Sequence, residues 1–210
     1  ILGPDGAAVP PGTDGAIVVK LPLPPASLFT LWNNDEGFLD AYMRSFPGYY
    51  ETGDAGHVDE DGYLYIMSRA DDVINVAGHR LSTGAIEEVV ATHPDVAECA
   101  VIGIKDALKG QVPIGFLVLN AGATIGDDEL SAAVVQEVRN KIGPVAAFKA
   151  ALVVSQLPKT RSGKILRGTM RRIADREAWA MPATIEDTSA LDTIAAALRA
   201  DVRRRAASRS

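Results

Sequence analysis

The chain contains very little cysteine and no long apolar segment, and each absence excludes a class of protein. Its single cysteine, Cys99, cannot form an internal disulfide, which permits a reducing compartment. Because Cys99 lies in the apolar run "AECAVIGI", we expect it to be a buried small hydrophobe. No apolar stretch approaches the ~20 residues that a membrane span requires, and no charged segment followed by an apolar one opens the chain. We therefore expect a cytoplasmic protein with no membrane partner.

An excess of positive charge is also missing, since the 210 residues carry a formal net charge of -6 and 47% of them are hydrophobic. That hydrophobic content is enough for one core and permits two. The C-terminal segment is the local exception, with five arginines at Arg199, Arg203, Arg204, Arg205 and Arg209. Nucleic-acid binding requires a broader basic face, so we interpret this segment as a solvated helix end and expect no nucleic-acid partner.

Turn residues dominate the first 30 positions, where "GPDG", "VPPGTDG" and "PLPP" surround one short β-type run at 16–19. The chain begins "ILGPDG", in the middle of a turn and without an initiator methionine, so we expect a piece of a longer protein. Residues 57–68, "HVDEDGYLYIMS", predict a hairpin with its turn at 59–62. The next segment, "DDVINVAGHRL", predicts two further strands around Gly78.

The apolar periodicity changes from that of strands to that of helices at Ser82, and either Ser82 or Thr83 is a possible N-cap. Helix patterns cover 82–93, 127–143 and 163–174, and apolar strands cover 96–106, 113–120 and 150–154. One more amphipathic helix follows, with its apolar stripe at Leu191, Ile194, Leu198 and Val202. The order βββαββαβα within 55–175 predicts an α+β domain, in which helices pack on a small mixed or antiparallel sheet after a β-rich segment.

Two short motifs carry residues that could bind a nucleotide. In "YYETGDAG", Asp54 follows a strand in a tight turn, where its oxygens could accept hydrogen bonds from two ribose hydroxyls or from its own backbone. In "SRADDVINVAGHRLS", Arg69 and Arg80 could each bind a phosphate or a ribose hydroxyl, or be ordinary surface arginines. Gly78 permits a close backbone approach to a ligand or simply a turn. Both alternatives stay open on these residues alone.

A basic loop at 157–168, "LPKTRSGKILRG", stands out in this acidic chain. It collects four cations, which are Lys159, Arg161, Lys164 and Arg167. It is not a phosphate-binding P-loop, because that pattern requires Gly at position 158 and Ser or Thr at 165, where this chain has Pro158 and Ile165. Like charges around Lys164 indicate a site that takes an anion, and a solvated basic loop is the alternative.

Taken in this order, "YYETGD", "SRADDVINVAGHRLS" and "LPKTRSGKILR" resemble the motifs of the adenylate-forming acyl-CoA synthetases, the AMP-binding enzymes. The segments "DALKGQVPIGFLVLN" and "MPATIEDTSALDTI" are similar to propionyl-CoA synthetases more than to acetyl-CoA synthetases. The resemblance implies the C-terminal part of such an enzyme. Its expected parts are the β-rich end of the large N-terminal domain at 1–68, a hinge at 69–72, a small mobile C-terminal domain at 73–175 and a helical basic tail at 176–210.

The resemblance implies an acid-thiol ligase with two reactions. ATP with Mg²⁺ would activate a short-chain carboxylate to an acyl-adenylate and diphosphate, and coenzyme A would then take the acyl group and release AMP. Asp54 would hold the ribose hydroxyls, and Arg69 and Arg80 would contact the ribose and phosphate. Lys164 would be the catalytic lysine of the first step. Reversible acetylation of Lys164, by a protein acetyltransferase and a deacetylase, is implied as well.

Further positions match the second step and the movement between the steps. Asp71 matches a hinge about which the C-terminal domain rotates. Ala77 and Gly78 match a strand that meets the pantetheine of coenzyme A, and Arg139 matches a position that pairs with its 3'-phosphate, although the residues after Arg139 depart from the family pattern.

A cation site is implied in "ATHPDV" by similarity to some relatives. Its ligands would be three backbone carbonyls, those of Ala91, His93 and Val96. An ordinary histidine at a helix end is the alternative interpretation of His93.

The phosphate loop, the acyl pocket and the adenine-binding residues of this family lie in the large N-terminal domain and have no counterpart here. We therefore expect the chain to be inactive by itself and to require that missing domain as its partner. Propionate is inferred from similarity only. The alternatives are an acetyl-CoA synthetase or another short-chain synthetase, an enzyme that loads a carrier protein, and a non-catalytic binding module with this fold.

Overall fold

The computed structural model of the protein describes residues 1–207, so Arg209 of the basic tail lies outside the described residues. The chain divides into two compact units, Ile1–Asp71 and Asp72–Ser210. The boundary follows Asp71, the position expected to be the hinge, and the rotation itself stays a prediction. No helix within the described part of the chain is long and apolar enough to cross a membrane.

The first unit is built on a three-stranded antiparallel sheet in the order β1-β2-β3. Its elements are β1 (Gly15–Lys20), α1 (Asp35–Tyr42), β2 (Tyr49–Val58) and β3 (Leu64–Arg69). β2 begins well before the hairpin predicted from residue 57, because its residues from Tyr49 to Gly56 pair with β1. Helix α1 was not predicted, although Asn34 is a typical N-cap and its side chain accepts a hydrogen bond from the Gly37 N–H at 3.0 Å.

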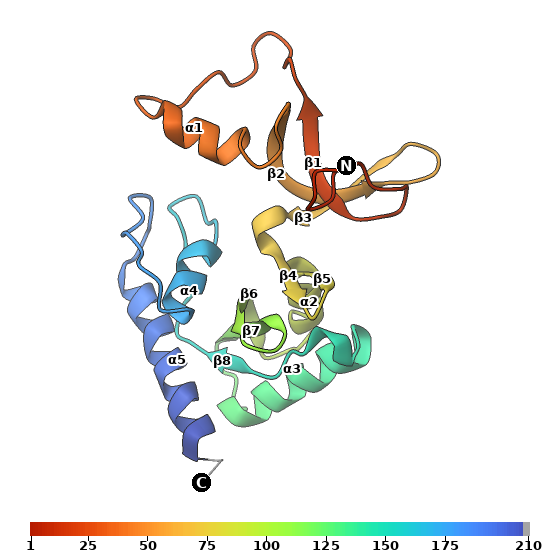
Figure 1. Cartoon of the computed structure of the whole chain (residues 1–210). Coiled ribbons are helices and arrows are strands. Elements are labelled where there is room, and N and C mark those ends of the chain that lie inside the picture. Colours follow the sequence, from red (N-terminus) through yellow and green to blue (C-terminus); the bar gives the residue numbers. More distant parts are fainter. Residues whose placement is uncertain (208–210) are drawn as a thin grey trace. The chain divides into compact units, whose positions relative to one another are not determined.

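The second unit contains a mixed sheet, as predicted (Figure 1). Its strands are β4 (Val73–Val76), β5 (His79–Ser82), β6 (Val96–Asp106), β7 (Gly110–Leu119) and β8 (Ala151–Val153). The order is β5-β4-β7-β6 with antiparallel pairs, while β8 pairs in parallel with β7. The α+β class is therefore confirmed.

Helices cover both faces of this sheet. They are α2 (Thr83–Val90), α3 (Asp127–Lys141), α4 (Arg167–Ala174) and α5 (Ser189–Ala207). Side chains alternate along β6 and β7, so Val101 and Leu117 belong to a core with α2 and α3, while Phe116 belongs to a second core with Met170 of α4 and Ile194 of α5. Burial on both faces explains why these strands are continuous apolar runs in the sequence.

Two of the predicted helices differ from the structure in detail. The helix expected at 163–174 begins only at Arg167, because residues 160–164 form a hydrogen-bonded turn. In α5 the predicted stripe holds at its start, where Leu191 and Ile194 are buried, but Val202 is exposed because the last turns extend beyond the core. Of the two possible N-caps, Ser82 and Thr83, it is Ser82 that caps α2, and its hydroxyl accepts a hydrogen bond from the Ala85 N–H at 3.4 Å.

Candidate functional site

Asp54 and Arg69 lie opposite each other on β2 and β3 of the first unit. The Arg69 Nη1 donates to Asp54 Oδ1 and to the carbonyl of Thr52, each at the long distance of 3.5 Å. Asp54 is only partly buried, and its own N–H donates to the Thr52 hydroxyl at 3.2 Å. The carboxylate is thus held in place with accepting capacity left over, which a pair of ribose hydroxyls could use.

Gly53 makes this pairing possible. It has a φ of 77°, and a Cβ at this position would lie 2.8 Å from the Arg69 Nη2. Any other residue would push the guanidinium away from Asp54, in a backbone conformation that side chains rarely adopt. The motif "TGD" therefore requires its glycine for both the turn and the close approach of Arg69.

In the second unit, β4 and β5 are joined by a two-residue turn, Ala77–Gly78. Both residues have positive φ, 49° and 88°, as a type I′ hairpin turn requires. Such a conformation is strained for alanine by roughly 1 kcal/mol. Both turn residues are exposed, and so is Arg80 on β5. The Ala77 N–H donates to the carbonyl of Lys109 at 2.8 Å, which ties this hairpin to the turn between β6 and β7.

Arg139 lines a pocket of about 210 Å³ in the same unit. Two further cations line it, Lys109 from the β6–β7 turn and Lys149 from the segment before β8. Asp106 accepts the N–H groups of Lys109 and Leu108, which keeps the pKa of its carboxyl low and fixes the turn. Because Lys109 also bonds Ala77, the structure brings the Ala77–Gly78 turn and the Arg139 pocket to one part of the unit.

Lys164 ends a tight turn that begins at Thr160. The Thr160 N–H donates to the Lys164 carbonyl at 2.8 Å, and the Lys164 N–H donates to the Thr160 hydroxyl at 3.1 Å. Isolated β-bridges join Lys159 to Ile165 and Thr160 to Ile185. The basic loop is therefore an ordered turn supported from both sides, with the Lys164 side chain exposed.

The other cations of this loop are mostly neutralised. Lys159 pairs with Glu98 at 2.6 Å, and Arg167 makes a bidentate pair with Glu87, with its closest contact at 2.7 Å. Within residues 1–207, the Lys164 ammonium has no hydrogen-bond or ion-pair partner. The expectation that four like charges crowd together is thus wrong for Lys159 and Arg167, whose charges are compensated.

Cys99 lies beside the Glu87–Arg167 pair and is partly buried, with its Sγ 3.5 Å from the Glu87 carbonyl. Burial raises the pKa of the Cys99 thiol to about 11, and the negative charge of Glu87 adds to this effect. The thiol is therefore protonated at neutral pH and is no nucleophile. Cys99 was predicted to be a buried small hydrophobe, and it packs against the core but is only partly buried.

The expected cation site lies between α2 and β6. The His93 carbonyl accepts the Val96 N–H at 3.1 Å, and His93 Nδ1 accepts the Asp95 N–H at 3.3 Å. The same Nδ1 lies 3.9 Å from Asp95 Oδ2. No group of three His, Cys, Asp or Glu side chains in the described ranges could hold a metal. A site of backbone carbonyls stays a prediction.

Sequence patterns missed three residues of these sites: Glu87, Lys109 and Lys149. Glu87 is separated from Arg167 by 80 positions, so no local pattern could pair them. Lys109 stands in the quoted segment "DALKGQ", and only its hairpin geometry shows that it lies near Arg139.

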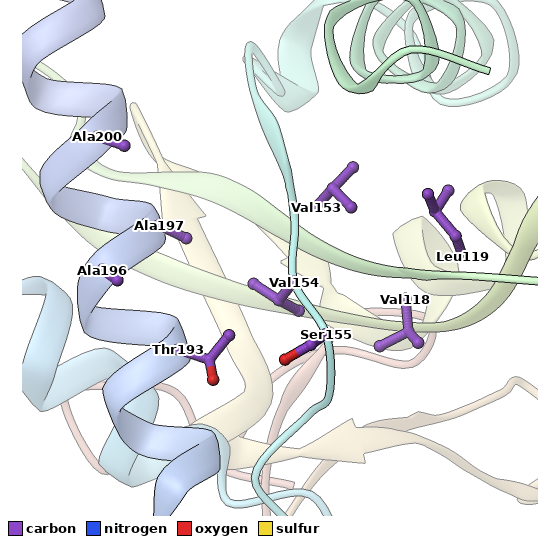
Figure 2. Close-up of a pocket in the computed structure, with 9 residues that line it drawn as sticks. All are labelled: Val118, Leu119, Val153, Val154, Ser155, Thr193, Ala196, Ala197 and Ala200. Atoms are coloured by element: carbon purple, nitrogen blue, oxygen red, sulfur yellow. The ribbon is translucent and has the colours of Figure 1, made fainter. Parts of the chain in front are cut away.

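A larger groove of about 570 Å³ runs between α5 and the end of β8 (Figure 2). Its walls are aliphatic, with Ala197 and Ala200 on α5 and Val154 pointing toward that helix, and its polar side chains are those of Ser155 and Thr193. It contains no titratable side chain among the residues that line it, so it offers no acid, base or charge for catalysis.

Sequence comparison supports the resemblance to the AMP-binding enzymes. Residues 85–164 match the profile of the AMP-binding enzyme C-terminal domain. The chain is 54% identical over 175 residues to the mitochondrial acyl-CoA synthetase short-chain family member 3 of Mus musculus, covering 83% of this chain and 26% of that protein. It is 41% identical over 192 residues to the acetyl-coenzyme A synthetase of Pyrobaculum arsenaticum, covering 91% and 28%. The chain thus spans about a quarter of these relatives' length.

Solved structures show the same fold. The acetoacetyl-CoA synthetase of Streptomyces lividans superposes with a TM-score of 0.80 over 95% of this chain and 30% of that one, at 24% identity. The ATP-bound MatB of Rhodopseudomonas palustris gives a TM-score of 0.66 at 27% identity, over 83% and 33%.

Proposed function

Because this chain carries the C-terminal domain of the AMP-binding enzymes, we propose that it is the C-terminal part of an AMP-forming short-chain acyl-CoA synthetase that acts on propionate. A propionate oxygen would attack the α-phosphorus of ATP, and the bond to the β-phosphate would break to release diphosphate. The coenzyme A thiolate would then attack the acyl carbon of propionyl-adenylate, and AMP would leave. Mg²⁺ would accompany ATP in the first step.

The observation that carries this proposal is the exposed ammonium of Lys164. This lysine is presented on an ordered turn with its ammonium exposed and, among residues 1–207, unpartnered, while the cations on either side of the turn are paired. A charge kept available in this way suits a site that takes an anion. In the adenylation step the ammonium would offset the charge that develops between the carboxylate and the α-phosphate. Acetylation of Lys164, which removes that charge, would stop this step.

The remaining residues take roles consistent with their geometry. Asp54, oriented by Arg69, would accept the ribose hydroxyls, and Arg80 would contact the ribose or phosphate. Arg139, with the two lysines of its pocket, would receive the phosphates of coenzyme A, and the exposed Ala77–Gly78 turn would contact its pantetheine arm. Asp71 would be the hinge between the two arrangements. The carbonyls of Ala91, His93 and Val96 remain the proposed cation site.

The first unit supports the existence of a larger domain around it. Its strand β3 leaves four consecutive large apolar residues exposed, from Leu64 to Met67, each by about half or more of its surface. A stable small protein rarely exposes so continuous an apolar strand. An upstream domain would cover this strand, and it would also supply the phosphate loop and the acyl pocket.

The choice of propionate is tested by a steady-state panel on the full-length synthetase with acetate, propionate, butyrate and malonate, following AMP formation. We expect the highest kcat/KM for propionate. One methylene contributes about 10- to 200-fold discrimination in an apolar pocket, so a preference for propionate over acetate should be measurable. A higher kcat/KM for acetate would contradict the choice of propionate. It would favour the alternative of an acetyl-CoA synthetase, the name of the Pyrobaculum relative.

A further inference from the structure

Glu87 and Arg167 form an ion pair in the second unit that is joined by three hydrogen bonds. Arg167 donates from Nε to Glu87 Oε1 at 3.0 Å, and from Nη2 to Oε1 and Oε2 at 2.8 and 2.7 Å. The Val101 N–H of β6 donates to the same Oε1 at 2.8 Å. Both side chains are largely buried, with exposed fractions of 16% for Glu87 and 23% for Arg167. The pair therefore joins α2, β6 and the first residue of α4 at one point.

The Glu87–Arg167 pair lies close to Lys164 along the chain. Arg167 follows Lys164 by three residues, and Leu166 between them donates its N–H to the Pro158 carbonyl at 2.9 Å, which closes the base of the loop. Removing one partner of such a pair would leave a largely buried charge without compensation. The start of α4, and with it the end of the Lys164 turn, would then lose its fixed position.

A second set of contacts holds the other end of the loop. Lys159 pairs with Glu98 of β6, its carbonyl accepts the Glu186 N–H at 2.9 Å, and the Arg161 N–H donates to the Thr184 carbonyl at 3.0 Å. The segment at 184–186 therefore pairs with the loop along its backbone. It is anchored by the buried Ile185 and by Asp187, which accepts from Gln156 at 2.8 Å.

We infer that Glu87 and Arg167 are positioning residues for Lys164, and that they fix the turn at 160–164 as a rigid extension of α4 and β6. The inference rests on the proposed function, since it concerns the adenylation step assigned to Lys164. Glu87 and Arg167 touch no reacting atom in this scheme. They act by keeping the Lys164 ammonium where the carboxylate and α-phosphate meet, instead of letting the loop sample many positions.

The test uses the full-length synthetase with Glu87→Gln, Arg167→Met and both together, and it measures the two half-reactions separately. Diphosphate release reports adenylation, and propionyl-CoA formed from synthetic propionyl-adenylate reports the second step. We expect each single variant to lower kcat for adenylation by about 10- to 100-fold with a smaller effect on the KM for ATP, since small misplacements of a catalytic group have costs of this size. The double variant should lose no more than the worse single one, because the pair acts as a unit. The second step should stay within about twofold.

Arg172→Gln is the matched control. Arg172 is an exposed arginine on the same helix, so its replacement by Gln changes the net charge by the same amount as Arg167→Met and should leave both half-reactions unchanged. An equal loss in this control would show that only the charge of the unit matters, and that outcome would overturn the inference.

Hydrogen exchange on the 210-residue chain gives a readout that does not depend on activity. In the Glu87→Gln chain, amides at 160–166 should exchange faster, while those of β6 and β7 keep their protection. Unchanged exchange at 160–166, together with full adenylation activity in the variants, would overturn the inference. Lys164→Ala separates the two claims: if that variant still adenylates propionate, the proposed function of Lys164 fails, whatever the exchange experiment shows.

Discussion

Lys164→Ala in the full-length synthetase should lower the rate of propionyl-adenylate formation by about 10²- to 10³-fold, the usual cost of removing one preorganised group that stabilises transition-state charge. The Lys164 ammonium is exposed and has no partner within residues 1–207, so its replacement breaks no contact that the fold needs. Thermal unfolding of the variant should therefore match that of the unaltered protein. Conversion of synthetic propionyl-adenylate to propionyl-CoA should also be retained.

Arg161→Gln is the matched control for this prediction. Arg161 belongs to the same turn and is also exposed, so its substitution removes one positive charge at nearly the same place. We expect it to weaken ATP binding by less than about tenfold, because an exposed charge contributes mainly screened, long-range attraction. Equal losses from both substitutions would mean that the loop acts by its net charge and that Lys164 has no individual role.

Phe116→Ala should cost the second unit about 3 to 5 kcal/mol in free energy of unfolding. Phe116 is fully buried in the centre of β7, and it belongs to the core that α4 and α5 close with Met170 and Ile194. Its loss leaves a cavity under the two helices that close this core. Because whole domains are stable by only about 5 to 15 kcal/mol, the variant should unfold at much lower urea concentration.

Val118→Ala, two residues along the same strand, is the comparison. Val118 is only partly buried and lines the open groove beside α5, so its truncation should cost roughly 1 kcal/mol or less. Urea unfolding followed by far-UV circular dichroism measures both variants. If Phe116→Ala were no more destabilising than Val118→Ala, the two-faced core of this sheet would be wrong.

Much of the second unit is predictable from its sequence because local patterns and tertiary packing agree there. Strands β6 and β7 are buried on both faces, which requires uninterrupted apolar runs, and the sequence has them. The start of α4 was misplaced because turn hydrogen bonds from Thr160 to Lys164 compete with helix formation, and propensity alone does not weigh them. Helix α1 was missed because its short, mostly polar sequence buries little besides Phe38.

The candidate site, like the fold, could be predicted only in part from the sequence. Asp54, Arg69, Arg80 and Lys164 stand in motifs whose order along the chain is recognisable without coordinates. Their supports are not, because they come from distant parts of the chain. Glu87 lies 80 positions from Arg167, and the segment at 184–186 pairs with the loop only after α4 has turned the chain back. Local sequence therefore indicated which residue carries the charge, and the fold was needed to see what holds it.

We propose that this chain forms its active site together with an upstream domain. The most direct test compares AMP formation by the isolated chain with AMP formation by the full-length synthetase. Each protein is incubated with ATP, Mg²⁺, propionate and coenzyme A. AMP and propionyl-CoA should accumulate with the full-length protein, and the isolated chain should form neither, because in the proposed arrangement the phosphate loop and acyl pocket would come from an upstream domain. Sustained AMP formation by the purified 210-residue chain, lost in its Lys164→Ala variant, would mean that the chain contains a complete site and that the shared-site proposal is wrong.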